Sequence, residues 1–256
     1  MANLYIHYPF CKQACHYCNF HFSTGVRGRD QMMGFIEEEL QIRASELKSP
    51  LESIYFGGGS PSLISTERIT SFISKVTNQF DTVEGMEITM EVNPDDVDED
   101  YLSRLKSAGI NRLSLGIQSF SEKDLRLMHR AHDRKEAENA LKAVKKHFEN
   151  FSLDLIYGMP DSSIVDWEES LSRALSYDPP HISAYALTVE EKTVLHHLVN
   201  KDKVTLLPEE TVKEQYDLLV ALLEQKKYIN YEFSSFGKPN FFSVNNQNYW
   251  NGKAYL

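Results

Sequence analysis

Residues 4–18, with the sequence LYIHYPFCKQACHYC, join an apolar run to the only three cysteines of the chain. The apolar run is rich in aromatic residues and ends at a proline, so it predicts a buried strand at 4–8. The cysteines follow directly, with three residues between the first two and two between the last two. One tight loop can therefore direct three sulfurs toward one point, which indicates a metal ion or an iron–sulfur cluster.

Other uses of these cysteines fit the sequence less well. A disulfide framework is disfavoured because the number of cysteines is odd and the chain is long enough to build its own core. Structural zinc is the alternative, with His7, His16 or His21 as a fourth ligand. Such zinc sites usually combine two short Cys/His knuckles, and no second knuckle follows here. A [4Fe–4S] cluster held by three thiolates would leave one iron open for chemistry.

The composition and net charge of the chain indicate which class of protein carries this site. The chain has 256 residues, of which 41% are hydrophobic and 25% charged, as in an ordinary globular protein. The net charge of -10 argues against a nucleic-acid partner, because such binding relies on neutralising phosphates. The first residues do not resemble a signal peptide, and no apolar run reaches membrane-spanning length. We therefore expect a cytoplasmic protein without an integral membrane segment.

Strand and helix patterns alternate along the chain. Strands are predicted at 4–8, 53–56, 86–92, 112–117, 152–157 and 181–187, and helices at 30–47, 66–80, 99–107, 134–147, 166–175 and 208–227. Alternation of this kind predicts an α/β fold with a parallel sheet. Six units are too few for a closed eight-stranded barrel, so we expect a partial (β/α)6 TIM-like barrel over residues 1–190. Residues 191–256 would begin a C-terminal α/β extension.

Unusual polar groups follow the predicted strands, where ligands bind in such folds. Glu91 ends the third strand, Gln118 follows the fourth and Asp154 lies in the fifth. Asp154 lies among apolar residues, and a buried carboxylate needs a partner. Arg130 is one candidate for that partner, although it could equally be a solvated charge at a helix end.

Three successive glycines follow the second strand, at 57–59, and lead into Ser60. They could form only a flexible turn, and they are not a phosphate loop because no Gly-Lys-Ser/Thr follows. They would also let a ligand approach the backbone closely, with the Ser60 hydroxyl as a donor. Tyr5 and Tyr17 would by default be a core and a loop aromatic residue.

Five motifs together resemble, in this order, the radical S-adenosylmethionine (SAM) enzymes related to oxygen-independent coproporphyrinogen III oxidase. They are C-x3-C-x-Y-C at 11–18, GGGSP at 57–61, EVNP at 91–94, GIQSF at 116–120 and DLIYGMP at 154–160. The resemblance implies that Cys11, Cys15 and Cys18 hold a [4Fe–4S] cluster whose open iron takes the amino and carboxylate groups of SAM. It further implies that the SAM site is lined by Tyr5, Tyr17, Gly58, Gly59, Ser60, Glu91, Gln118, Arg130 and Asp154. The chemistry implied is reductive cleavage of SAM to methionine and a 5′-deoxyadenosyl radical.

Two branches of that family differ in features that this chain shows. The oxidase branch has a further cysteine where this chain has Phe20, and a longer segment before its cluster. Both differences favour the HemW-like heme chaperones, which bind heme and pass it to acceptor proteins. The resemblance then implies heme, a heme-acceptor protein and an electron donor as partners. The alternative is an enzyme, an oxidoreductase that decarboxylates coproporphyrinogen III.

The C-terminal part departs from the chaperone branch in two ways. Residues 246–250, NQNYW, are similar to its His-Asn-x-x-Tyr-Trp segment, but Asn245 stands where the histidine is expected. Asparagine is a poor iron ligand in place of imidazole. The other candidates for a heme ligand are His21, His129, His132, His196 and His197. The family also continues beyond the last residue of this chain, so we expect a truncated extension.

Overall fold

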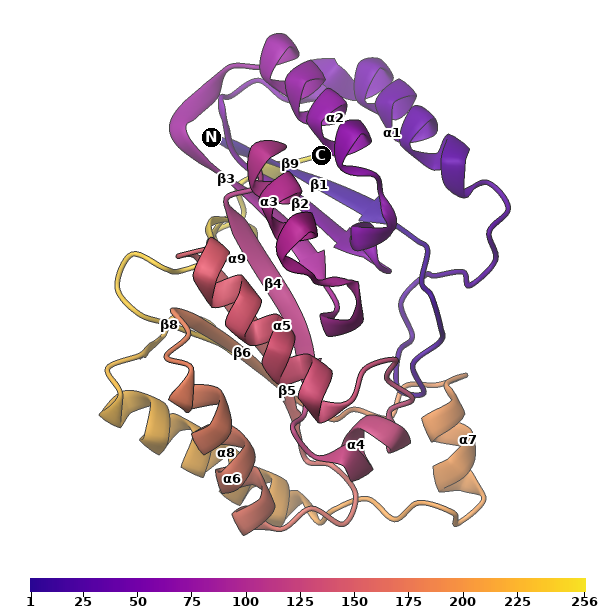
Figure 1. Cartoon of the computed structure of the whole chain (residues 1–256), viewed down its shortest axis with the longest axis vertical. Coiled ribbons are helices and arrows are strands. Elements are labelled where there is room, and N and C mark those ends of the chain that lie inside the picture. The colour runs from indigo at the N-terminus through magenta and orange to yellow at the C-terminus, as the bar shows by residue number, and fades with distance from the viewer.

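Six parallel strands form the centre of the computed structural model, which describes residues 1–256 (Figure 1). They are β1 (Ala2–Tyr8), β2 (Leu51–Gly58), β3 (Thr82–Val92), β4 (Arg112–Gln118), β5 (Phe151–Tyr157) and β6 (His181–Ala186). Neighbours in the sequence are neighbours in the sheet, and each of these pairs is parallel. The sheet order, β7-β8-β6-β5-β4-β3-β2-β1-β9, does not close on itself. The predicted α/β partial barrel is therefore confirmed.

Helices surround this curved sheet, and most of them cover its outer face (Figure 1). They are α1 (Arg29–Arg43), α2 (Thr66–Gln79), α3 (Glu99–Ser107), α4 (Glu122–Leu127), α5 (Arg134–His147), α6 (Ile164–Ser176), α7 (Val194–Asn200), α8 (Glu209–Gln225) and α9 (Val244–Trp250). Side chains cap several of them, and α5 begins with a capping box between Asp133 and Glu136. None of the helices combines the length and the apolar character needed to cross a membrane.

The two faces of the strands have different chemistry, because successive side chains point to opposite sides of a sheet. On β5, Leu153 and Leu155 belong to the main apolar core, and neither is exposed to solvent. Ser152 and Asp154, on the other face, take part in hydrogen bonds among polar side chains. The apolar core thus lies between sheet and helices, and the concave side of the sheet is polar.

The last part of the chain extends the same sheet at both edges. β7 (Ile229–Asn230) and β8 (Ser235–Gly237) continue it antiparallel beyond β6, and β9 (Ala254–Tyr255) pairs with β1. The chain consequently ends beside β1, as Figure 1 shows. All three strands come after residue 190, and the proposed domain boundary there stays a prediction.

Helix α9 lies across the beginnings of the strands and is held there by one buried amide. The side-chain nitrogen of Asn248 donates to Asn3 Oδ1 at 2.7 Å and to Glu52 Oε2 at 2.8 Å. Lys253 adds an ion pair to the same Glu52 carboxylate, at 2.8 Å. These contacts close the end of the partial barrel where the strands begin.

We predict that Asn248→Ala lowers the free energy of unfolding by about 1 kcal/mol, because the two hydrogen bonds of this buried amide are lost while Asn3 keeps Ser53 and Glu52 keeps Lys253 as donors. Thermal unfolding followed by circular dichroism measures this change. Asn251→Ala is the matched control, since Asn251 is exposed at the end of the same helix. Equal melting temperatures for the two variants would contradict the role given to Asn248.

Candidate functional site: a thiol loop facing two buried carboxylates

The cysteine loop leaves the end of β1 and is closed by short backbone pairing. Ser23 N donates to Pro9 O at 2.7 Å, and Cys11 N donates to Ser23 O at 3.0 Å. Further along the loop, His16 N donates to Met128 O at 3.0 Å, just beyond α4. The loop is therefore fixed at its base and at its tip, over the carboxyl ends of the strands.

The three thiols form a donor set that suits an iron–sulfur cluster. All three cysteines are free and half-buried, and burial raises the pKa of the Cys11 and Cys18 thiols. Arg130 Nη1 lies 3.4 Å from Cys15 Sγ. No set of three or more His, Cys, Asp or Glu side chains is arranged around one point as a single ion requires. Thiolates that bind separate irons of a cluster need no such convergence.

The glycine loop after β2 packs directly against the cysteine loop. Gly59 N donates to Tyr8 O at 2.8 Å, and Ser60 N donates to Phe10 O at 2.7 Å. A Cβ atom on Gly59 would lie 2.6 Å from Phe10 O, a distance that real side chains do not adopt. Only glycine lets the two backbones approach this closely, so the triple glycine is more than a flexible turn.

Two carboxylates lie buried across from these loops. Glu91 accepts hydrogen bonds from the Tyr55 hydroxyl at 2.9 Å and from Gly58 N at 3.2 Å. Burial raises the pKa of Glu91 to about 7, and the nearby Asp154 carboxylate adds to the rise. Burial also raises the pKa of Asp154, which accepts a hydrogen bond from Ser114 at 2.9 Å. Neither carboxylate has a cation within ion-pair distance, so both would be stabilised by a cationic ligand.

The predicted pairing of Asp154 with Arg130 is wrong. Arg130 Nη2 donates instead to Asn93 Oδ1 at 2.7 Å and to Gly116 O at 3.0 Å. The cation whose charge acts on Asp154 is Arg112, which opens β4 and is buried. Arg112 was not among the residues predicted for the site, although its position two residues before Ser114 places both on the inner face of the strand.

One cavity of about 530 Å³ brings the predicted site residues together. It is lined by all twelve of them, namely Cys11, Cys15, Cys18, Tyr5, Tyr17, Gly58, Gly59, Ser60, Glu91, Gln118, Arg130 and Asp154. Gln118 adopts a left-handed backbone conformation with φ of 66°, which is uncommon outside glycine and frequent at functional sites. Asn93, Ser114 and Tyr185 also line the cavity and were missed, because only the sheet register brings them here.

This arrangement can bind a ligand that carries both signs of charge. Soft thiolates lie on one wall, and the buried carboxylates of Glu91 and Asp154 lie on another. The guanidinium of Arg130 lies between them, beside Cys15. The cavity therefore suits an amino acid-like ligand with an amine or sulfonium cation and a carboxylate, next to a thiolate-held cluster.

The sequence matches the radical SAM superfamily over residues 5–174. This match covers more than half of the chain and includes the cysteine loop, both carboxylates and Arg130. The chain therefore belongs to the radical SAM superfamily.

Similarity to individual proteins shows to which family within the superfamily the chain belongs. The chain is 34% identical to the heme chaperone HemW of Bacillus subtilis over 260 residues, covering 100% of this chain and 69% of that protein. It is 35% identical to the HemW of Synechocystis over 259 residues, covering 98% of this chain and 63% of that protein. Within the superfamily, the chain belongs to the HemW family.

A solved structure shares the fold. Coproporphyrinogen III oxidase from Escherichia coli, a radical SAM enzyme, superimposes with a TM-score of 0.81 at 24% identity. The match covers 98% of this chain and 58% of that one. The superposition over nearly the whole chain supports the partial barrel. At this sequence identity it shows that the two proteins share a fold and nothing more.

We predict that Glu91→Gln changes how stability depends on pH. In the folded protein without ligands the pKa of Glu91 is about 7, against 4.5 for an ordinary glutamate. The folded state thus binds the proton more tightly, and wild-type stability falls as pH rises through this window. The glutamine variant lacks this loss and should gain about 2 kcal/mol relative to wild type between pH 5 and pH 8.

Urea unfolding of the protein without cluster at these two pH values measures the difference. Glu38→Gln serves as the control, because Glu38 is an exposed residue of α1. Parallel pH dependences for Glu91→Gln and wild type would show that Glu91 is ionised normally.

Proposed function

We propose that this chain is a heme chaperone of the HemW type, which holds a [4Fe–4S] cluster and SAM side by side and delivers heme to an acceptor protein. One observation carries the proposal. The cysteine loop faces Glu91, Asp154 and Arg130 across one cavity, in a chain 34% identical to a heme chaperone. The partners that it requires are heme, the acceptor and an electron donor, all in the cytoplasm.

In this proposal Cys11, Cys15 and Cys18 would hold the cluster, and SAM would bind at the iron that they leave without a protein ligand. Arg130 pairs with the SAM carboxylate, while Glu91 and Asp154 accept hydrogen bonds from its amino group or ribose hydroxyls. The other lining residues shape the site by backbone and ring contacts: Tyr5, Tyr17, Gly58, Gly59, Ser60 and Gln118. When bound, the cluster supplies one electron to the ligand on its open iron. The protein binds and orients that ligand and keeps water away.

Heme would contact an exposed aromatic patch, defined as Tyr249, Trp250 and Tyr255. The rings of Tyr249 and Trp250 lie 5.5 Å apart, those of Tyr249 and Tyr255 lie 6.4 Å apart, and each residue is more than 60% exposed. Exposed aromatic surface of this kind is typical of a binding site for an apolar partner. The planes of Tyr249 and Trp250 are inclined by 80°, so one of these rings could stack on a porphyrin face while the other meets its edge.

The candidate iron ligands differ in their surroundings. His132 is buried and bonded to Ile117 O, and burial with the nearby Arg130 lowers its pKa to about 4. His196 Nε2 is occupied by Asn200. His129 is exposed, and its Nδ1 lies 2.9 Å from Ala14 O, which leaves Nε2 open in the manner of many metal-bound histidines. His129 lies beside the cysteine loop, at the opposite end of the strands from the aromatic patch, so it could not ligate a heme that is held on that patch.

The second candidate function is the oxidative decarboxylation of coproporphyrinogen III. The shared fold with coproporphyrinogen III oxidase favours it. Phe20 argues against it, because this ring is 67% exposed at the cavity where the oxidase branch is expected to carry a further cysteine.

We predict that Cys15→Ala abolishes the cluster, because two remaining thiolates cannot hold it. Anaerobic reconstitution followed by iron and sulfide analysis is the measurement. Asn19→Ala, a change in an exposed residue of the same loop, should keep the wild-type iron content. Zinc without iron in the wild type, or a full cluster in Cys15→Ala, would contradict the assignment.

We also predict that the wild-type protein gives a shifted Soret band with hemin and keeps the heme through gel filtration. The same preparation, with a reductant and SAM under anaerobic conditions, should not convert coproporphyrinogen III. A vinyl-bearing product at useful turnover would establish the oxidase instead. No Soret shift and no retained heme would contradict the chaperone.

A further inference from the structure

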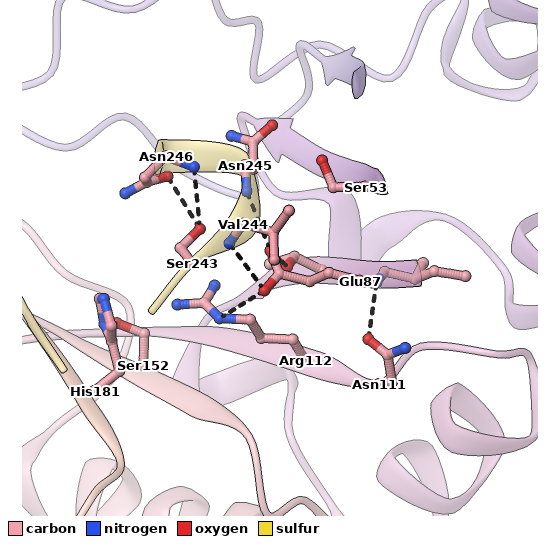
Figure 2. A network of polar contacts seen from close by, with 12 residues as sticks. Ser53, Glu87, Asn111, Arg112, Ser152, His181, Ser243, Val244, Asn245 and Asn246 are labelled. Atoms are coloured by element: carbon pink, nitrogen blue, oxygen red, sulfur yellow. Dashed lines mark hydrogen bonds and ion pairs between the residues drawn. The ribbon is translucent and has the colours of Figure 1, made fainter. Parts of the chain in front are cut away.

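A second polar network lies below the cavity, on the inner face of the sheet where the strands begin (Figure 2). Glu87 accepts hydrogen bonds from Val244 N at 3.2 Å and from Asn245 N at 3.4 Å, at the start of α9. Arg112 Nε lies 3.8 Å from the same carboxylate. We call residues 243–245 the floor segment, because they cover this end of the partial barrel.

A chain of hydrogen bonds runs from the floor segment to Asp154. Ser243 N donates to the Tyr231 hydroxyl at 3.1 Å, and that hydroxyl lies 2.8 Å from His181 Nε2. His181 Nδ1 lies 2.7 Å from Ser152 Oγ, which in turn lies 3.4 Å from Asp154 Oδ1. Asp154 lines the cavity above, so the chain connects the floor segment to the ligand site.

The hydrogens along this chain point in one direction. The Tyr231 hydroxyl accepts from Ser243 N, and its own proton needs an acceptor, which is His181 Nε2. We assign the His181 proton to Nδ1, which donates to Ser152 Oγ, so that the Ser152 hydroxyl can donate to Asp154 Oδ1 at 3.4 Å or to Ser183 Oγ at 3.3 Å. His181 is fully buried, and burial together with the charge of Arg112 lowers its pKa, which keeps the ring neutral.

Arg112 adds a charge to this hydrogen-bonded chain. It is 2% exposed, and its Nε has no hydrogen-bond partner. A buried guanidinium with one distant carboxylate is costly unless its field stabilises other groups. Its positive charge opposes the rise that burial causes in the pKa of Asp154, and so favours the ionised form of that carboxylate.

We propose that Ser152, His181 and Arg112 are positioning residues that hold the Asp154 carboxylate for SAM, with the floor segment at the outer end of their network. The inference rests on the proposed binding of SAM in the cavity. Its consequence is a coupling between the two ends of the barrel: a change at residues 243–245 alters SAM affinity, and bound SAM restrains the floor segment equally.

The test compares two serine-to-alanine substitutions at buried positions of the sheet. Ser152→Ala removes the hydroxyl that faces Asp154, whereas Ser53→Ala removes one that donates to Asn3 Oδ1 at 2.8 Å. Neither serine is exposed to solvent. We expect the dissociation constant of SAM, measured on the cluster-loaded protein, to rise about fivefold for Ser152→Ala. For Ser53→Ala we expect less than about a twofold change, with a similar loss of thermal stability in both.

Tyr231→Phe provides a second variant outside the cavity and should weaken SAM binding in the same direction. In an Asp154→Asn background, Ser152→Ala should have no further effect, because its action passes through Asp154. Equal SAM affinities for Ser152→Ala and Ser53→Ala, or additive effects of the Ser152 and Asp154 changes, would overturn the inference alone. Failure of the cluster-loaded wild type to bind SAM would overturn the proposed function, and the inference with it.

Discussion

The parallel pairing of six strands is the constraint on which the rest of the structure depends. It places every strand end on one edge of the sheet, so loops that are far apart in the sequence meet there. The cysteine loop follows β1, the triple glycine ends β2 and Glu91 lies near the end of β3, so three neighbouring strands bring them together. Register then decides which side chains share the concave face, and it aligns Asp154 of β5 with Ser183 of β6.

Burying charged side chains on that concave face costs free energy, and the two ends of the strands differ in how well polar partners offset that cost. Near the strand beginnings, Glu87 and Arg112 lie within 3.8 Å of one another, and backbone N–H groups satisfy the carboxylate. Near the strand ends, Glu91 and Asp154 have hydrogen bonds but no cation, and burial raises both pKa values. A cationic ligand bound near the strand ends would supply the positive charge that Glu91 and Asp154 lack there. The hydrogen-bonded chain from the floor segment reaches one of these two carboxylates, Asp154, through Ser152.

Much of the site could be predicted from the sequence, because its signals are local. Three cysteines at short spacing and a triple glycine are visible without any tertiary information, and strand patterns indicate which edge they share. The partner of Asp154 could not be predicted, because the choice between Arg130 and Arg112 depends on register and side-chain direction. Likewise, nothing local shows that Asn245 lies at the strand beginnings, where its backbone N–H meets Glu87. That contact joins residues 158 positions apart.

The central claim is that the open iron of a cluster held by Cys11, Cys15 and Cys18 takes SAM inside this cavity. Electron paramagnetic resonance of the reduced, reconstituted protein tests it most directly, because the signal reports the ligands of the cluster. The account predicts a [4Fe–4S] signal that changes when SAM is added and changes less in Asp154→Asn or Glu91→Gln at the same SAM concentration. A signal in the wild type that is identical with and without SAM would contradict it.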